Sequence, residues 1–314
     1  MAPGEAEPIA RDGVAPALPC RQCGGTSLAN LGPLPPGDTF AGRPLEPPWS
    51  GGDLMRCGHC RLVFRAPVLD ERAYEALYAQ APDSVWTSDR PRGDRKPVLD
   101  LIARHAPTAR DILDLGCYDG SLLERIDLPV PKYGVEASRA AADVARDRGI
   151  EIVATAMREL PTIAARFDIV MAIDVMEHVL DPSAFLLEML RLTRPGGLVL
   201  VSTGNADAWP FRLAGATYWY SAIAEHLSFV SDSWMRAFAG RHAVEILALE
   251  RFRYYDEPAV HRSSAALAFT VAAIKRRLRR RLIGWLGRED TPASWHLAGP
   301  GMFEDHFVIA LRKP

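Results

Sequence analysis

The sequence lacks any run of about 18 or more apolar residues, which argues against a membrane-spanning helix. Its first residues, MAPGEAEPIARDGVAPALP, contain neither a basic segment nor an apolar segment, so they do not predict a secretory signal. We expect residues 1–18 to form a disordered lead-in, because Pro, Ala, Gly and acidic residues dominate them. These absences predict a cytoplasmic protein.

Cysteine is scarce, and four of the five cysteines stand in two C-x-x-C pairs: Cys20, Cys23, Cys57 and Cys60. This spacing lets two tight turns direct four thiolates at one tetrahedral ion, and soft thiolates favour zinc. The sequence therefore predicts a small zinc ribbon over residues 19–67 with a structural ion. The Pro- and Gly-rich stretch between the pairs is interpreted as an inserted loop. A redox dithiol, or His59 in place of one cysteine, is the alternative.

A dinucleotide-binding loop is also missing. The stretch DILDLGCYDGS at 111–121 has Gly116 and Gly120, but Tyr118 and Ser121 stand where a G-x-G-x-x-G loop has its second and third glycines. No phosphate-binding lysine follows. With acids close by, such a loop suits a cationic nucleoside without phosphates better than a pyrophosphate.

Predicted strands and helices alternate from about residue 95. The predicted strands lie at 111–115, 132–137, 150–155, 167–174, 198–203, 243–252 and 305–313. Ser138 and Asp181 are expected helix N-caps. The alternation predicts an α/β sheet with helices on both faces and a ligand site at the carboxyl ends of its strands.

Glu136 ends the second strand of this domain, twenty residues after Gly116. A carboxylate there can accept charge-assisted hydrogen bonds from both hydroxyls of a ribose. Together with the loop, it predicts a nucleoside that carries a positive charge, and S-adenosylmethionine is such a ligand.

Four segments carry a family resemblance: DILDLGCYDGSLL, YGVEAS, FDIVMAIDVMEHVLDP and LTRPGGLVLVST. In this order they resemble the motifs of Rossmann-like S-adenosylmethionine-dependent methyltransferases, closely over 111–205. With the cysteine pairs ahead of them, the chain is similar to zinc-ribbon methyltransferases that modify sugars, including sugar C-methyltransferases and glycan-cluster enzymes. The resemblance implies a doubly wound, seven-stranded sheet with an antiparallel last strand at 95–314. A linker helix and loop at 68–94 would follow the zinc ribbon.

The resemblance and the linker helix together suggest nine cofactor-binding residues: Asp114, Gly116, Tyr118, Gly120, Glu136, Ala156, Met157, Asp174 and Tyr78. The loop glycines and the two aspartates would lie at the methionine portion, and Glu136 at the ribose. Ala156 and Met157 would flank the adenine. The ring of Tyr118 would pack on the cofactor or on the linker helix. Tyr78 would cover the pocket, or else pack on the next domain.

Methyl transfer needs an aligned nucleophile and often a base. Two acid–histidine pairs qualify, Glu177-His178 after the fourth strand and Glu225-His226 after the fifth. In the sugar C-methyltransferases that the chain resembles, the corresponding Glu-His supplies the base. This favours His226 as the base with Glu225 assisting and His178 as second choice. A helix-capping role for the first pair and a buried structural role for His226 are the alternatives.

Positive charge is concentrated between Arg262 and Arg288, where eight Arg or Lys residues occur without an acid. The segment predicts a basic amphipathic helix within an insert at about 258–290. Residues 272–288 suit an anionic membrane surface, so the protein would lie peripherally at the inner face of the membrane. A helix solvated on the protein's own surface, or one that contacts nucleic acid or a second copy, is the alternative.

The leading functional hypothesis is methyl transfer, to oxygen or carbon, on a sugar that is nucleotide-linked or part of a surface glycan or secondary metabolite. The predicted partners are a small-molecule or glycan acceptor, with no nucleic acid. Two alternatives stay open. One is an RNA methyltransferase whose ribbon contacts RNA, although the ribbon is only modestly basic. The other is a non-catalytic S-adenosylmethionine-binding scaffold at a membrane surface.

Overall fold

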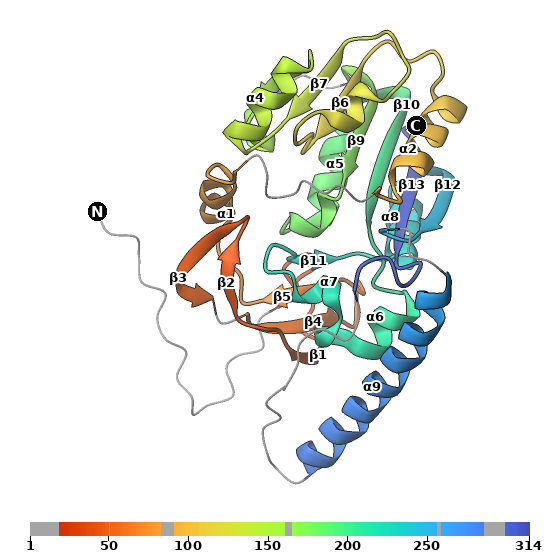
Figure 1. Cartoon of the computed structure of the whole chain (residues 1–314). Coiled ribbons are helices and arrows are strands. Elements are labelled where there is room, and N and C mark those ends of the chain that lie inside the picture. Colours follow the sequence, from red (N-terminus) through yellow and green to blue (C-terminus); the bar gives the residue numbers. More distant parts are fainter. Residues whose placement is uncertain (1–18, 50, 83–90, 161–164, 256–258, 286–298) are drawn as a thin grey trace.

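The computed structural model describes residues 19–49, 51–82, 91–160, 165–255, 259–285 and 299–314 (Figure 1). The predicted lead-in at 1–18 lies outside the described residues.

The main sheet has seven strands and confirms the predicted fold class. Its spatial order is β12 (Glu245–Phe252), β13 (His306–Arg312), β10 (Thr193–Gly204), β9 (Phe167–Ile173), β6 (Ile112–Leu115), β7 (Lys132–Val135) and β8 (Glu151–Ala154). The last strand, β13, runs antiparallel to both of its neighbours, and the pairs from β10 to β8 are parallel. The carboxyl ends of the parallel strands therefore meet at one edge.

Helices cover both faces of this sheet (Figure 1). One core contains residues of α2 (Arg95–His105), α3 (Ser121–Glu124) and α4 (Arg139–Asp147). The other contains residues of α5 (Pro182–Leu192) and α8 (Asp232–Arg241). Successive residues of β10 alternate between these cores, with Leu200 in the first and Val201 in the second, as the two-residue period of a strand requires.

The predicted N-caps are confirmed. The Ser138 hydroxyl accepts the amide of Ala141, and the Asp181 carboxylate accepts the amides of Ser183 and Ala184. These bonds begin α4 and α5 directly after the strand ends that carry the site, so local sequence sets where the strand-to-helix loops lie.

The cysteine-bearing segment forms a second sheet of order β1 (Leu28–Pro33), β4 (Asp53–Cys57), β5 (Val63–Ala66) and β11 (Ser228–Phe229). The stretch interpreted as an inserted loop contains a hairpin instead, made of β2 (Gly37–Phe40) and β3 (Arg43–Trp49). Its turn residues Ala41 and Gly42 have φ of 46° and 74°, which is the left-handed backbone of a tight two-residue hairpin turn. The sequence did not predict this hairpin because β3 contains several prolines, and proline usually argues against a strand.

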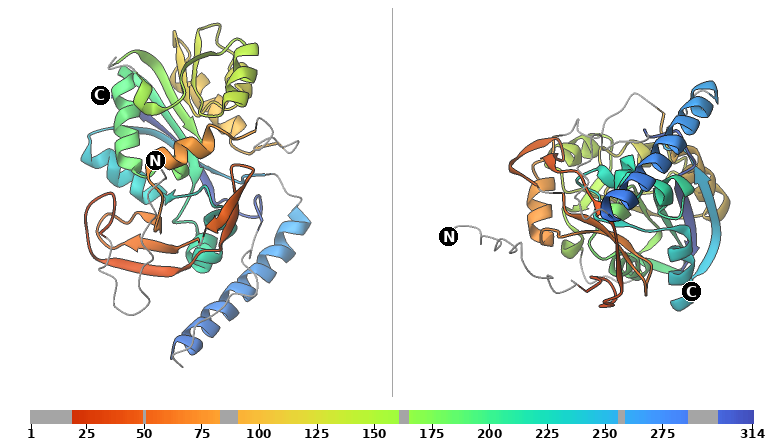
Figure 2. Two further views of the ribbon diagram at one scale, coloured as in Figure 1. Left: turned by 90° about the vertical axis from the view of Figure 1, so that its left-hand side faces the viewer. Right: turned by 90° about the horizontal axis from the view of Figure 1, so that it is seen from below.

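The shorter elements are α1 (Glu71–Tyr78), α6 (Trp209–Ala214), α7 (Trp219–Ala222) and the 3₁₀ segments η1 (Met157–Glu159), η2 (Met176–His178) and η3 (Gly215–Thr217). The predicted basic helix is α9 (Ala259–Trp285), which projects from the rest of the molecule (Figure 2). Among the described residues, no helix combines the length and apolar content needed to cross a bilayer.

Candidate active site

The glycine loop lies between β6 and α3, at the carboxyl edge of the sheet. Gly116 and Gly120 have φ of 79° and 75°, and a Cβ on either residue would collide with a neighbouring side chain. Added at position 116 it would lie 2.6 Å from Val175, and at position 120 it would lie 2.8 Å from Ile150. Tyr118 also has left-handed φ, at 50°, although it carries a side chain. The loop thus keeps its close approach to the strand ends without the middle glycine.

Glu136 is buried at the end of β7 and is tied to the glycine loop. One carboxylate oxygen accepts the amide of Tyr118 at 2.8 Å, and the other accepts the amide of Ser138 at the same distance. Burial raises the pKa of this carboxyl group, and the two amide hydrogen bonds oppose that rise. Each oxygen keeps a further lone pair, so the carboxylate is held in place with the capacity to accept further hydrogen bonds, as the predicted ribose contact requires.

Asp114 and Asp174 end β6 and β9 and are short of partners. Among the described residues, Oδ1 of each has no hydrogen-bond partner. Burial raises the pKa of Asp114 to about 7 and that of Asp174 to about 6. The other oxygen of Asp174 pairs with Arg92 at 2.6 Å. One buried and one half-buried carboxyl group with open oxygens beside a glycine loop fit a ligand that brings positive charge, as the sulfonium and ammonium groups of S-adenosylmethionine would.

Ala156 and Met157 lie half-buried after the end of β8, on the same edge of the sheet. Tyr78, at the end of α1, lies with its hydroxyl 2.8 Å from Nδ1 of His178. The sheet edge thus brings the predicted cofactor residues together, while Tyr78 contacts a predicted catalytic residue. Their roles toward a cofactor stay predictions.

The side chains of the first acid–histidine pair and of His226 lie together beside this edge. One ligand atom each of Glu177, His178 and His226 lies within 4.8 Å of the others. The first two stand on η2, four residues or fewer after Asp174, whereas His226 comes from the loop before β11. The amide of Leu227 donates to the carbonyl of Glu177 at 2.7 Å, which joins the two segments.

The hydrogen bonds of the cluster orient its rings. Nδ1 of His226 lies 2.8 Å from the carbonyl oxygen of Tyr220, and Nδ1 of His178 lies 3.1 Å from that of Glu225. Since a carbonyl only accepts, we infer that the ring of His226 carries its proton on Nδ1 and keeps a lone pair on Nε2. Nδ1 of His178 also lies 2.8 Å from the hydroxyl of Tyr78, so this ring has the same tautomer when that hydroxyl accepts. Burial, followed by the neighbouring His178, holds the pKa of His226 well below its usual range, so this ring is neutral.

Glu225 does not contact His226 with its carboxylate. That group accepts the amide of Ala41 at 2.6 Å, so it fastens the β2–β3 hairpin to the loop before β11. The aromatic residues Tyr218, Trp219 and Tyr220 are buried, so the aromatic segment belongs to the core and does not form an open stacking surface.

The structure contains one further acid–histidine pair that the sequence did not predict. His306, at the start of β13, is buried, and its Nδ1 lies 2.9 Å from Oδ1 of Asp305. The other oxygen of Asp305 accepts bonds from Tyr218 and Trp219. Burial lowers the pKa of His306, but the Asp305 carboxylate outweighs it and the net direction is upward. In the sequence, this pair is marked only by its position as two polar residues directly before an apolar strand.

The cysteine-bearing sheet holds the loop of His226 in place. Arg65 on β5 is 1% exposed and donates to four carbonyls, those of His226, Gly51, Ser221 and Ile223. Arg21 donates to the carbonyls of Arg65 and Leu227 and to the hydroxyl of Ser228. Since β11 also pairs with β5, the second sheet positions one wall of the site.

The four cysteine sulfurs gather beside this sheet, all within 4.8 Å of one another. The Cys20–Cys60 and Cys23–Cys57 sulfur pairs are each 3.6 Å apart. A tetrahedron with Zn–S bonds of about 2.3 Å places its sulfurs about 3.8 Å apart. The amides of His59 and Cys60 point at Cys57 Sγ, and the four-thiolate donor set fits zinc.

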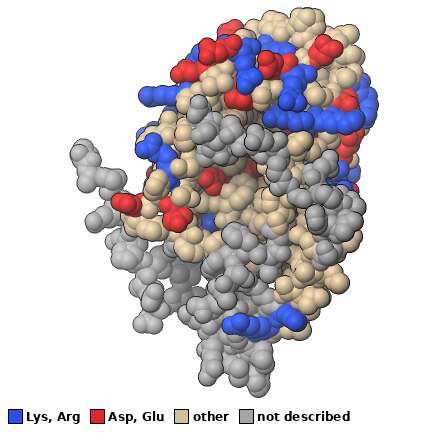
Figure 3. Space-filling model, viewed as in Figure 1, with Lys and Arg blue, Asp and Glu red and all other residues tan. Residues whose placement is uncertain are grey.

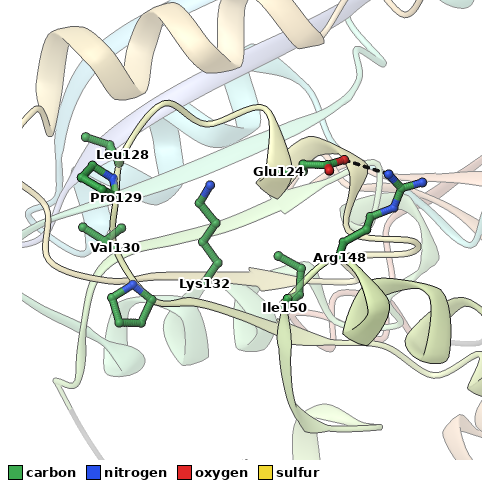
Figure 4. A pocket seen from close by; sticks show the side chains of 9 residues that line it. Glu124, Leu128, Pro129, Val130, Lys132, Arg148 and Ile150 are labelled. Atoms are coloured by element: carbon green, nitrogen blue, oxygen red, sulfur yellow. Dashed lines mark hydrogen bonds and ion pairs between the residues drawn. The ribbon is translucent and has the colours of Figure 1, made fainter.

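A hollow of about 380 Å³ lies elsewhere, at the amino end of β7 (Figure 4). It is lined by Lys132, by apolar residues and by the Glu124–Arg148 ion pair, whose atoms are 2.8 Å apart. It contains none of the predicted site residues. By contrast, Figure 3 shows acidic side chains in the recess between the upper and lower parts of the molecule.

Comparisons with known proteins match the part of the chain that contains this site. A family model described as a methyltransferase domain matches residues 87–241, a range that includes the glycine loop and the histidine cluster but not the four cysteines or α9. A ubiquinone biosynthesis O-methyltransferase of Chromobacterium violaceum is 30% identical over 188 residues, which are 53% of this chain and 79% of that protein. A protein of the same name from Caulobacter sp. is 35% identical over 153 residues, 43% of this chain and 59% of the relative.

The chain spans less than two thirds of the length of the first three curated relatives that it matches. Among solved structures, the N-methyltransferase NodS from Bradyrhizobium japonicum aligns with a TM-score of 0.47 at 13% identity, covering 77% of this chain and 97% of that one.

These relatives correct the predicted acceptor. They are named for O-methyl transfer in ubiquinone biosynthesis, not for sugar modification, so the prediction of a sugar acceptor is wrong. The alternatives of an RNA methyltransferase and of a non-catalytic scaffold gain no support from them either. The chemical signal that favoured a sugar was the cysteine pairs, which lie outside the matched family model.

Proposed function

Because the chain belongs to the S-adenosylmethionine-dependent methyltransferases, we propose that it transfers a methyl group to a hydroxyl oxygen of a small biosynthetic intermediate. The curated relatives are named as O-methyltransferases of a biosynthetic pathway, and this supports oxygen as the acceptor atom.

The observation that carries the proposal is the adjacency of two sites on one sheet edge. Asp174, with its open carboxylate oxygen, ends β9, and His178 follows on η2 within four residues. A donor held by the glycine loop, Asp114 and Glu136 would therefore have its methyl group beside the imidazoles. Adjacent sites of this kind align donor and acceptor, which is the main requirement of methyl transfer.

In the proposed reaction, S-adenosylmethionine supplies a methyl group bonded to a cationic sulfur. The acceptor hydroxyl lies against His226 and His178, and its proton passes to an Nε2 lone pair of this pair of rings. The hydroxyl oxygen forms the new bond to carbon, and the electrons of the C–S bond return to sulfur. His226 is the preferred base. Glu225 acts as a positioning residue, because its backbone carbonyl holds His178.

Methyl-labelled S-adenosylmethionine and a panel of small phenols, catechols and alcohols test this proposal. We expect label in a methyl ether. A variant with both His226→Ala and His178→Ala should turn over roughly 10²–10⁴-fold more slowly and bind S-adenosylhomocysteine as before. The exposed His242 supplies the control His242→Ala, which should behave as wild type. Label on carbon or nitrogen alone would contradict O-methylation, and near wild-type turnover of the double variant would contradict the role of the imidazoles.

We propose in addition that the four cysteine thiolates bind one structural zinc ion. The short sulfur–sulfur distances and the amide–sulfur hydrogen bonds support this. A closed set of four thiolates leaves no position for a substrate. The ion would act by stabilising the sheet whose β5 strand and Arg65 hold the loop of His226.

We also propose that α9 binds an anionic membrane surface. An exposed apolar stripe follows the spacing i, i+4, i+7, i+11 along this helix: Leu267, Val271, Ile274 and Leu278. Phe269 and Ala273, which are buried, lie roughly 150° around the helix from that stripe. The stripe therefore points away from the protein.

Positive charge accompanies the stripe. Positions 275–281 hold six cations, and the exposed side chains of Lys275 and Arg279 belong to them. Figure 3 shows basic side chains near the lower end of the molecule, where this helix lies. Each Lys or Arg near an anionic leaflet contributes about 1 kcal/mol, and apolar burial adds to it. An anionic bilayer therefore matches both the charge and the apolar stripe.

Sedimentation with vesicles tests the membrane contact. The protein should bind vesicles of anionic lipid and dissociate from them as the salt concentration rises. It should not bind vesicles of neutral lipid. Replacing Ile274 and Leu278 by Ser should weaken binding at least about tenfold, because burial of each stabilises by about 1.5–3 kcal/mol. Leu187→Ser, at an exposed leucine of α5, is the control and should leave binding unchanged. Equal binding to both lipids, or self-association through the stripe without lipid binding, would contradict the proposal.

A further inference from the structure

We propose that Glu177, His178 and His226 form a binding site for a divalent metal ion. The site is separate from the four-cysteine cluster and is assembled from two segments far apart in the sequence. One ligand atom of each residue lies within 4.8 Å of the other two. Two imidazoles and one carboxylate form a facial set that leaves further coordination positions open.

The hydrogen bonds around the three residues are those expected around a metal ion. A metal-binding histidine usually donates its second ring N–H to a carbonyl or a carboxylate, which fixes the ring and the tautomer. Here Nδ1 of His226 lies against the carbonyl of Tyr220, and Nδ1 of His178 lies against the carbonyl of Glu225 and 2.8 Å from the hydroxyl of Tyr78. The Nε2 lone pairs are then the available ligands.

The carboxylate is oriented in the same manner. The hydroxyl of Thr203 donates to Oε2 of Glu177 at 2.7 Å and lies 3.2 Å from the hydroxyl of Tyr220. The amide of Gly204 in turn donates to that tyrosine at 2.9 Å. Glu177 is only 2% exposed, so its position is set by protein groups. A buried carboxylate without a nearby cationic group is costly.

Electrostatics favours a cation at this point. Two inferred Nε2 lone pairs and a carboxylate oxygen converge, whereas the neighbouring Asp174 is already paired with Arg92. Arg65 on β5 directs its nitrogens at backbone carbonyls of the loop and not at the carboxylate of Glu177. A divalent ion would neutralise the convergent acceptors and would leave a coordination position facing the proposed acceptor.

The role of the ion rests on the proposed function, although its binding does not. A hydroxyl that coordinates a divalent ion loses its proton more readily. The proton would leave to solvent, and the oxygen would be held next to the methyl donor. Activation by the metal would then replace direct proton transfer to His226.

Cobalt(II) titration of the zinc-loaded protein tests the site without any acceptor. Beyond the thiolate site, we expect one further equivalent of Co²⁺, with visible d–d bands and no thiolate charge-transfer band. His178→Ala, His226→Ala and Glu177→Gln should each weaken this equivalent by at least about 100-fold. Thr203→Val, which removes only a supporting bond, should weaken it by roughly 10–100-fold. His242→Ala should leave it unchanged.

The proposed site would be overturned if the zinc-loaded protein bound no further Co²⁺. It would also be overturned if the His178→Ala/His226→Ala double variant kept its fold and still bound the further equivalent. Unchanged zinc content and thermal unfolding establish that fold. Methyl transfer after chelation separates the two proposals. Activity that survives removal of the ion leaves the imidazole base in place and contradicts the metal role. An ion that binds to a protein that methylates no hydroxyl contradicts the proposed function alone.

Discussion

Glu136→Ala should weaken S-adenosylhomocysteine binding by roughly 10²–10⁴-fold. The carboxylate is the proposed acceptor for both ribose hydroxyls, and each hydrogen bond to a charged group contributes about 1.5–3 kcal/mol. It also anchors Tyr118 of the glycine loop, so its loss removes ligand contacts and loosens the loop. Isothermal titration with S-adenosylhomocysteine measures the effect, because this ligand needs no acceptor.

Two further variants sharpen this test. Glu136→Gln keeps the shape of the side chain but loses the charge, so it should bind with intermediate affinity. Glu151→Ala removes an exposed acid at the amino end of the neighbouring strand β8 and should bind like wild type. If Glu136→Ala binds within a few-fold of wild type while its thermal unfolding is unchanged, this carboxylate does not hold the nucleoside.

Cys57→Ser should remove the zinc ion and destabilise the protein by at least about 4 kcal/mol, because loss of a structural metal is among the largest single-residue effects. The damage should extend to the active site. Cys57 ends β4, and β4 pairs with β5, which pairs in turn with β11 beside His226. Metal analysis and thermal unfolding measure the loss, and protease cleavage within 220–230 should become faster.

The fifth cysteine offers a matched control. Cys117 is buried in the glycine loop, outside the four-cysteine cluster. Cys117→Ala should retain one zinc ion per chain and resist cleavage at 220–230. Full zinc content in Cys57→Ser, together with thermal unfolding equal to that of the control, would refute the four-thiolate site.

Local signals predicted the strands and helix starts at the carboxyl edge of the sheet correctly. Ser138 and Asp181 begin their helices through side-chain bonds to amides two or three residues away, and Gly116 adopts its left-handed φ within a single loop. Such features depend on neighbours in the chain, so the residue types reveal them. The strands from 111 to 203 were predictable for the same reason, since their apolar runs end at turns.

Other features were not accessible from the residues alone. The hairpin at 37–49 is rich in proline, which concealed its strands. Glu225 was paired with His226 because the two are adjacent in sequence, yet its carboxylate bonds to Ala41. His306 lies in the last strand and comes beside Gly204 at the carboxyl end of β10 only because β13 inserts antiparallel between β10 and β12. The domain boundaries remain predictions, although Cys57 and Phe64 of the ribbon share one core with the main sheet.

By itself, the sequence determined which residues are candidates for the chemistry: the loop and acids for a cationic nucleoside, four thiolates for a metal, and histidines for the acceptor. Only the tertiary structure decided which of them face one another. It placed His226 against Glu177 and His178, and it used the cysteine-bearing sheet as support for that loop. The physical reason is the distance along the chain over which each interaction acts. Caps, turns and strand periods act over a few residues, whereas the pairing of β5 with β11 joins segments more than 150 residues apart, and only packing of the whole chain selects it.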